Sequence, residues 1–115
     1  MKSIKLKIKK EKVANREMFF SFYELIKIAV NNTPQGGYSI DEMQKRLRIL
    51  NELETHKELF DIEESKFDDS MLVREAELNL EDSDFIKLKE LVKDCKWGIL
   101  AQSIIELNEQ FEEKK

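Results

Sequence analysis

The sequence predicts an α+β fold in which about four amphipathic helices pack on a small two- or three-stranded sheet. Residues 3–10 and 71–80 alternate apolar and polar side chains, which is typical of half-buried strands. Residues 15–31, 39–56, 82–96 and 99–111 repeat apolar side chains every three or four positions, which is typical of helices with one buried face. A mostly α fold with one hairpin is the alternative. The 115 residues contain no obvious linker, so we expect a single domain over 1–115.

The first predicted strand has one apolar face and one basic face, which consists of Lys5, Lys7 and Lys9. Lysines on a sheet edge discourage pairing with other chains. If the strand lies beside residues 72–80, the lysines share a sheet face with Glu75 and Glu77, and such cross-strand charge pairs are mildly stabilising. A basic strip that binds nucleic acid is the third interpretation.

The predicted helix over 15–31, with Asn15 as its cap, is unusually aromatic. Four of its aromatic side chains fall within five positions, which exceeds what one helix face can bury. Either another element covers the second side or the cluster is a subunit contact. The candidate interaction surface consists of Phe19, Phe20, Phe22, Tyr23, Trp97 and Phe111.

The predicted helix over 39–56 begins with a capping box, in which Ser39 and Glu42 satisfy each other's backbone amides. The residues expected to face inward are Ile40, Met43, Leu47, Leu50 and Leu53. The basic residues of this helix lie mostly on its outer face. The alternative functional hypothesis is therefore a nucleic-acid-binding regulator that uses this helix and the basic strand. Its candidate contacts are Lys5, Lys7, Lys9, Lys45, Arg46 and Arg48.

Residues 52–70 carry eight acidic residues and two lysines, which predicts a solvated acidic surface or a surface for a basic partner. Residues 59–64 are a possible short strand that would form a hairpin with 71–80. Towards the C-terminus, Gly98 is the expected left-handed stop between the last two helices, and Leu100 is expected on the apolar stripe of the second.

The residues that support catalysis are scarce. His56 is the single histidine, and Cys95, the single cysteine, falls on an apolar helix face where a buried thiol is expected. We therefore predict no enzymatic activity, no catalytic residues, no cofactor and no metal site. No apolar run reaches the length of a membrane span, and the N-terminus lacks the apolar core of a signal peptide, so we predict a cytoplasmic protein without a membrane partner.

Three stretches, 36–47, 78–85 and the pair Lys96-Trp97, are similar to small uncharacterised proteins encoded by bacteriophages and prophages. The similarity covers about half of the chain and consists of helix caps and apolar stripes. The resemblance implies an accessory protein that acts in the bacterial cytoplasm by binding another molecule, and it implies no particular functional residue. Together with the scarcity of reactive groups, it favours a non-catalytic interaction protein that binds a protein partner or forms a homo-oligomer.

Overall fold

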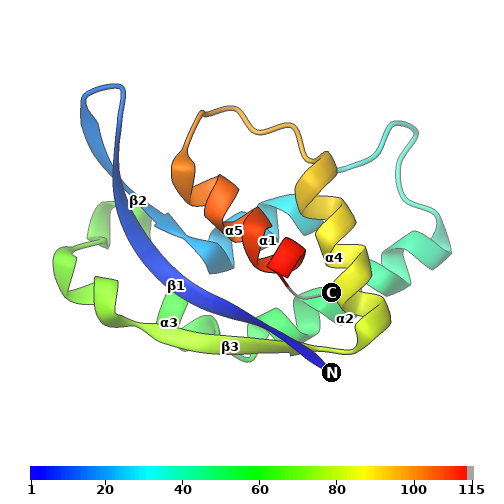
Figure 1. Cartoon of the computed structure of the whole chain (residues 1–115). Coiled ribbons are helices and arrows are strands. Elements are labelled where there is room, and N and C mark those ends of the chain that lie inside the picture. The colour runs from blue at the N-terminus through cyan, green and yellow to red at the C-terminus, as the bar shows by residue number, and fades with distance from the viewer. Residues whose placement is uncertain (114–115) are drawn as a thin grey trace.

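A three-stranded antiparallel sheet with the strand order β2-β1-β3 forms one layer of the protein, and helices pack on it (Figure 1). The structure is a computed structural model that describes residues 1–113. The strands are β1 (Lys2–Val13), β2 (Arg16–Ser21) and β3 (Glu75–Leu80). The helices are α1 (Phe22–Val30), α2 (Ile40–Glu54), α3 (Lys57–Phe60), α4 (Asp82–Asp94) and α5 (Gln102–Glu113). The predicted α+β class is confirmed. Within residues 1–113, no helix is long and apolar enough to cross a bilayer.

The pairing of β1 with β3 explains much of the basic face of the first strand. Lys5 lies opposite Glu77, and Lys7 lies opposite Glu75. The ammonium of Lys5 is 3.9 Å from the carboxylate of Glu75. Ile4 of β1, on the other face of the sheet, lies opposite Leu78, and both are fully buried. The predicted cross-strand charge pairing is therefore confirmed, and the alternation of the two strands reflects one buried and one charged face.

The predicted helix over 15–31 is wrong in its first part, because residues 16–21 form β2 and helix α1 starts at Phe22. β1 continues to Val13, and Ala14 and Asn15 then reverse the chain with φ angles of 51° and 66°. Positive φ at both central residues is the geometry of the two-residue turn whose twist matches a β-hairpin. Asn15 is thus a turn residue and not a helix cap. The aromatic run is divided between a strand and a helix, so it does not crowd one helix face.

The segment between α2 and β3 is helical, and the possible strand over 59–64 is wrong. It contains α3 and two short 3-10 turns, η1 (Glu64–Lys66) and η2 (Asp69–Val73). The carboxylate of Asp68 accepts a hydrogen bond from the amide of Ser70 at 2.9 Å, which favours the start of η2 over an extended chain. β3 therefore begins at Glu75 and not at 71.

Helix α2 begins as predicted, since the hydroxyl of Ser39 accepts a hydrogen bond from the amide of Glu42 at 3.1 Å. The predicted inner face is wrong in its first half. Its residues Ile40, Met43 and Leu47 are exposed, whereas the buried residues of the helix are Arg46, Ile49 and Leu53. The helix packs on α1, α4 and β3 through this second stripe. Arg46 is buried there, instead of lying outward, because its guanidinium finds hydrogen-bond acceptors in the neighbouring chain.

The last two helices are joined by an extended loop, residues 95–101, and not by a left-handed glycine. α4 ends at Asp94, and Cys95 has extended angles of φ −65° and ψ 137°. Gly98 is not among the described residues with positive φ, so its predicted role is wrong. Leu100 belongs to this loop and is 95% exposed, whereas it was expected on a helical stripe. In Figure 1 the loop runs along the top of the molecule, from the end of α4 to the start of α5.

Candidate functional site

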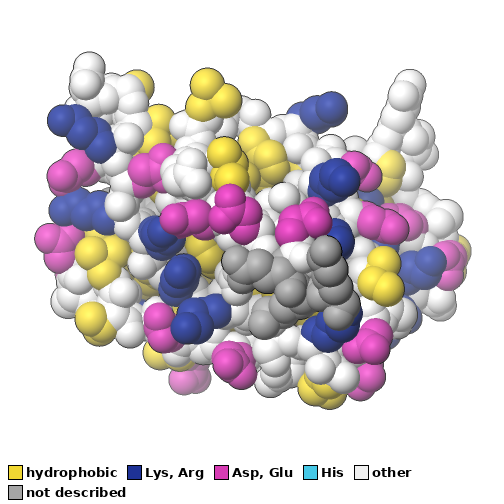
Figure 2. All heavy atoms as spheres, viewed as in Figure 1, with side chains coloured by type: hydrophobic (Ala, Val, Ile, Leu, Met, Phe, Trp, Pro, Cys, Tyr) yellow, Lys and Arg dark blue, Asp and Glu magenta, His cyan; other side chains and the backbone are white. Residues whose placement is uncertain are grey.

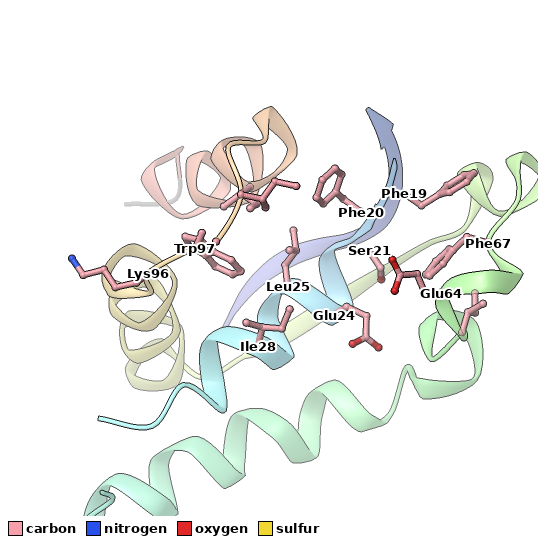
Figure 3. Close-up of a pocket in the computed structure, with 14 residues that line it drawn as sticks. Phe19, Phe20, Ser21, Glu24, Leu25, Ile28, Glu64, Phe67, Lys96 and Trp97 are labelled. Atoms are coloured by element: carbon pink, nitrogen blue, oxygen red, sulfur yellow. The ribbon is translucent and has the colours of Figure 1, made fainter. Parts of the chain in front are cut away.

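An apolar hollow with a volume of about 470 Å³ lies beside β2, and we call it the β2-edge groove (Figure 3). Three segments line it: residues 19–28 of β2 and α1, residues 62–67 before η2, and residues 96–104 of the loop and the start of α5. Most of the lining side chains are aliphatic or aromatic. A concave apolar surface with a few polar groups is the usual form of a binding site.

The groove crosses the outer edge of β2. Phe19 and Phe20 are neighbours in this strand, so their side chains point to opposite faces of the sheet. Both nevertheless line the groove. This is geometrically possible only where the hollow extends around the strand edge. β2 is one of the two edge strands and pairs with β1 alone, so no strand of residues 1–113 pairs with its outer side.

Aromatic rings form two walls of the groove. The rings of Phe19 and Phe67 are stacked, with centroids 5.7 Å apart and planes 14° from parallel, and the ammonium of Lys10 lies 5.7 Å from the centroid of Phe19. On the other side, the indole Nε1 of Trp97 donates a hydrogen bond to the carbonyl of Val92 at 3.3 Å. This bond ties the tryptophan to the end of α4. The rigid rings give the groove a defined shape.

Three polar side chains lie toward one end of the groove in Figure 3. Ser21 is 4% exposed, and its buried hydroxyl has no hydrogen-bond partner within residues 1–113. Burial raises the pKa of the Glu24 carboxyl, an effect that Lys27 opposes and Asp61 adds to. Glu64 also lines the groove there. The side chain of Lys96 lies at the opposite end, with its ammonium pointing away, so the polar end of the groove is acidic.

Exposed apolar side chains surround the loop that borders the groove. Figure 2 shows hydrophobic side chains gathered over the connection between α4 and α5. Ile28, at the rim of the groove, is 51% exposed. A second, shallower hollow contains Leu100 and Ile105 and shares Trp97 and Ile99 with the lining of the first. The apolar surface thus continues past the groove itself.

Glu11 of β1 holds the start of α5, which forms one wall of the groove. Its carboxylate accepts hydrogen bonds at 2.7 Å from the amides of Gln102 and Ser103 and, at the same distance, from the Ser103 hydroxyl. These are free amides of a first helical turn, so Glu11 acts as an N-cap supplied from a distant strand. Further along, the side-chain amide of Gln110 bonds the backbone of Lys5 through both of its groups, at 2.9 and 3.1 Å.

We expect replacement of Glu11 by glutamine to lower the free energy of unfolding by about 1 kcal/mol at pH 7, the usual effect of losing a charged cap. The Ser103 hydroxyl and the two amides lower the pKa of the Glu11 carboxyl. The stabilisation by its charge is therefore complete above the unfolded pKa and is lost as the pH falls through the lower, folded pKa.

Urea unfolding at pH 7 and at pH 3 tests this effect of Glu11. The difference between the wild type and Glu11→Gln should shrink at the lower pH. Glu17→Gln, which removes an exposed partner of Lys10, is the control and should change the free energy by less than about 0.5 kcal/mol. A pH-independent difference would contradict the proposed role of the charge.

The six predicted interaction residues separate into two groups. Phe19, Phe20 and Trp97 come together around the groove, although they lie far apart in the sequence. The other three are fully buried core residues, Phe22, Tyr23 and Phe111. The prediction missed the remaining walls of the groove, above all Phe67. The available signal was that Phe67 is one of only two aromatic residues in the acidic stretch 52–70, the other being Phe60.

The six predicted nucleic-acid contacts do not form a free basic surface. Most are in ion pairs within the chain: Lys5 with Glu75, Lys9 with Glu106, Lys45 with Asp41, Arg46 with Glu42, and Arg48 with Asp84. The ammonium of Lys7 lies 5.6 Å from the ring centroid of Phe22. On the face drawn in Figure 2, basic and acidic side chains are interspersed. Nothing in this arrangement favours nucleic-acid binding, which stays a prediction.

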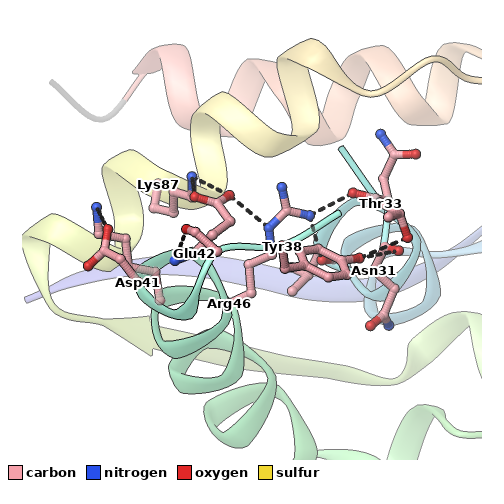
Figure 4. A network of polar contacts seen from close by, with 11 residues as sticks. Asn31, Thr33, Tyr38, Asp41, Glu42, Arg46 and Lys87 are labelled. Atoms are coloured by element: carbon pink, nitrogen blue, oxygen red, sulfur yellow. Dashed lines mark hydrogen bonds and ion pairs between the residues drawn. The ribbon is translucent and has the colours of Figure 1, made fainter. Parts of the chain in front are cut away.

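Arg46 lies at the centre of a network of polar contacts inside the protein (Figure 4). Its guanidinium donates hydrogen bonds to the carbonyls of Val30 and Asn32 at 2.9 and 2.7 Å, and to the carboxylate of Glu42 at 2.9 Å. It also lies 4.9 Å from the ring centroid of Tyr38. These contacts fasten the loop between α1 and α2 to the second helix. The guanidinium of Arg46 thus makes its contacts within the chain and is not free to bind a phosphate.

The described residues offer little reactive chemistry. Within residues 1–113, no three histidine, cysteine or carboxylate side chains are grouped so that they could hold a metal ion. Cys95 is a buried free thiol, and burial raises its pKa, which keeps it protonated. The arrangement can bind apolar groups, but it presents no activated nucleophile at the groove.

The fold and the groove together define a small α+β domain with an apolar groove at a sheet edge. Comparison of the chain with protein-family models, with curated proteins and with solved structures finds no match. The resemblance to phage-encoded proteins is therefore still a prediction, and the function has to be argued from the groove itself.

Proposed function

We propose that this chain is a non-catalytic binding protein that takes an apolar segment of a protein partner into the β2-edge groove. One observation carries the proposal: Phe19, Phe20 and Trp97 surround a single open hollow, and exposed apolar side chains continue from its rim. An exposed, contiguous apolar surface of this kind usually marks an interaction site. The proposed setting is that of a phage or prophage accessory protein in a bacterial cytoplasm, as the resemblance implies.

The binding free energy that the groove can supply sets how many side chains the partner has to bury. Burial of one large aliphatic side chain contributes about 1.5–3 kcal/mol, whereas a dissociation constant near 1 μM requires about 8 kcal/mol after the loss of rotational and translational freedom. A single anchor is therefore insufficient. A useful partner has to place several side chains along the groove and its neighbouring hollow, which favours a peptide segment over a small metabolite.

A peptide titration with two matched variants tests the proposal. The probe is a blocked seven-residue peptide that alternates leucine with threonine, and the readout is the emission of Trp97, the only tryptophan of the chain. Ile28→Glu places a charge at the rim of the groove, which the bound peptide would have to desolvate, so we expect affinity to fall at least about tenfold. Ile86, 54% exposed on α4 and outside the groove lining, is the matched control position.

Ile86→Glu should bind the peptide like the wild type. Equal affinity of the two variants would contradict the placement of the site, and the absence of any change in Trp97 emission with the wild type would contradict the proposal as a whole. Circular dichroism of both variants verifies that they are folded.

Self-association through the same apolar surface is the second form of the proposal. Leu100 and Ile105 are exposed next to the groove, and a second copy would bury them. Light scattering gives the mass directly. A dimer that Ile28→Glu converts to a monomer would place the subunit contact at the groove, whereas a monomeric wild type would leave the groove to another partner.

A further inference from the structure

We infer that the occupant of the β2-edge groove is an extended segment of a partner protein that adds a strand to β2 and places a basic side chain beside its apolar ones. The inference rests on the function proposed above and adds the backbone conformation and the charge of the partner. Three observations carry it: the open backbone of β2, the two unlike sides of the groove, and the unpaired acidic groups at one end.

The backbone of β2 is free on its outer edge. Val13 and Arg16 flank the two-residue turn and form the first pair of the β1–β2 ladder. In a hairpin of this type the flanking pair is hydrogen-bonded, and hydrogen-bonded and open pairs then alternate along the ladder. The N–H and C=O groups of Glu17 and Phe19 therefore point away from β1. No hydrogen bond from the rest of residues 1–113 reaches them.

The groove has unlike sides on the two faces of the sheet. Phe20 shares its face with Lys9, and α5 packs on that face through the ion pair of Lys9 with Glu106. The groove is apolar there, because Ile104 of α5 lines it together with the loop. Phe19 points to the other face, where it stacks on Phe67. An added strand alternates its side chains between these two sides.

The second side is also the acidic one. Glu64 precedes Phe67 on the same wall, and neither Glu64 nor Glu24 has an ion-pair partner within residues 1–113. Burial raises the pKa of Glu24, so a cation placed beside it would favour its charged form. The Ser21 hydroxyl, buried without a partner, adds a hydrogen-bond group at the same end. An apolar side chain toward α5 and a lysine or arginine toward Glu64 would match both sides.

A second copy of this chain matches the groove poorly. The other edge strand of the sheet, β3, carries Glu75 and Glu77, so its addition to β2 would bring more negative charge to an acidic groove. β1, which has the alternating apolar and basic pattern, is the central strand. Its residues 2–7 pair with β3, its residues 8–13 pair with β2, and the backbone of Lys5 is also bonded by the side chain of Gln110, so the strand is already engaged within its own chain. The segment therefore has to come from another protein. A dimer in light scattering would contradict this part of the inference.

The test compares four blocked seven-residue peptides by the emission of Trp97 at about 0.1 M salt. Three alternate leucine with lysine, threonine or glutamate, and the fourth is the lysine peptide with alternate amides N-methylated. We expect the lysine peptide to bind about tenfold more tightly than the glutamate peptide, with the threonine peptide between them. The N-methylated peptide should lose at least about tenfold, because it can no longer donate to the strand edge.

A pair of double variants separates a local charge effect from general attraction between a basic peptide and an acidic protein. Glu24→Gln with Glu64→Gln should bring the lysine and glutamate peptides to within about twofold of each other and leave the threonine peptide unchanged. Glu75→Gln with Glu77→Gln removes the same charge on β3 and should keep the preference. If the control pair abolished the preference equally, the acidic end of the groove would have no special role.

The outcomes also separate this inference from the proposed function. Equal binding of the lysine and glutamate peptides overturns the charge assignment, and equal binding of the methylated peptide overturns strand addition. In both cases the threonine peptide still binds, and the groove stands as a binding site. Failure of all four peptides to change the emission of Trp97 overturns the proposed function as well.

Discussion

Replacement of Arg46 by alanine is expected to lower the free energy of unfolding by about 3 kcal/mol. The side chain is 7% exposed and supplies the hydrogen bonds to two backbone carbonyls, those of Val30 and Asn32. Alanine would leave these acceptors without a donor and would remove one partner of Glu42, whose pKa is lowered first by Lys87 and then by Arg46. Urea unfolding at pH 7 measures the loss.

Two further variants test whether the buried hydrogen bonds of Arg46, and not its charge alone, cause this loss of stability. Lys45→Ala removes the neighbouring ion pair with Asp41, which is largely exposed, and should change the free energy by less than about 0.5 kcal/mol. Arg46→Lys keeps the charge but not the planar set of donors, so we expect it to recover less than half of the loss. An Arg46→Ala protein within about 1 kcal/mol of the wild type would contradict a structural role for this network.

The sequence predicted the strands and helices whose periodicity is local and unambiguous. β1 and α4 lie close to their predicted positions, and the charge pairing of β1 with β3 followed from two alternating segments. The strand β2 was missed because an aromatic run fits a buried strand as well as a helix. Residues 16–21 form a strand and not a helix because β1 extends to Val13 and, after a two-residue turn, pairs with them. That information is not local to residues 16–21.

The orientation of α2 was missed for a related reason. Its sequence contains two stripes with helical spacing, and the longer one begins with Ile40 and Met43. The helix instead buries the stripe that includes Arg46, because that side chain reaches carbonyls at the end of α1. Helical periodicity identifies the possible stripes, and the neighbours select one of them. A buried arginine with backbone partners cannot be recognised from one helix alone.

The groove depends on tertiary structure even more than the orientation of α2 does, so the sequence predicted only some of its residues. The prediction named Phe19, Phe20 and Trp97, but it gave no reason to join the tryptophan to the others. They meet because β2 is an edge strand and because the loop over 95–101 returns past it. Of the two acidic groups of the site, Glu24 escaped the prediction, since burial, and not sequence, makes it unusual. Glu64 belongs to the acidic stretch 52–70, for which a basic partner was one of the two interpretations.

Replacement of Phe111 by alanine is expected to have the largest effect on stability, about 3–5 kcal/mol. This residue was a predicted interaction residue, yet it is fully buried and its ring centroid lies 5.3 Å from that of Phe85. A cavity would remain between α5 and α4, because the surrounding helices are held by the sheet. Phe111→Leu, which fills most of that volume, should lower the free energy of unfolding by only about 1–1.5 kcal/mol. If the alanine protein is largely unfolded, the leucine variant still gives a measurable loss of stability.

Phe19 should behave in the opposite way, because it lies at the groove and is only half-buried. Phe19→Ala loses one stacked ring pair and should cost about 1 kcal/mol of stability. The same variant should weaken the binding of the leucine–threonine peptide at least about tenfold, whereas folded Phe111→Leu should bind it normally. The two phenylalanines then separate stability from binding, since one lies in the core and the other in a wall of the site. Equal effects of both variants on binding would place the peptide somewhere other than the edge of β2.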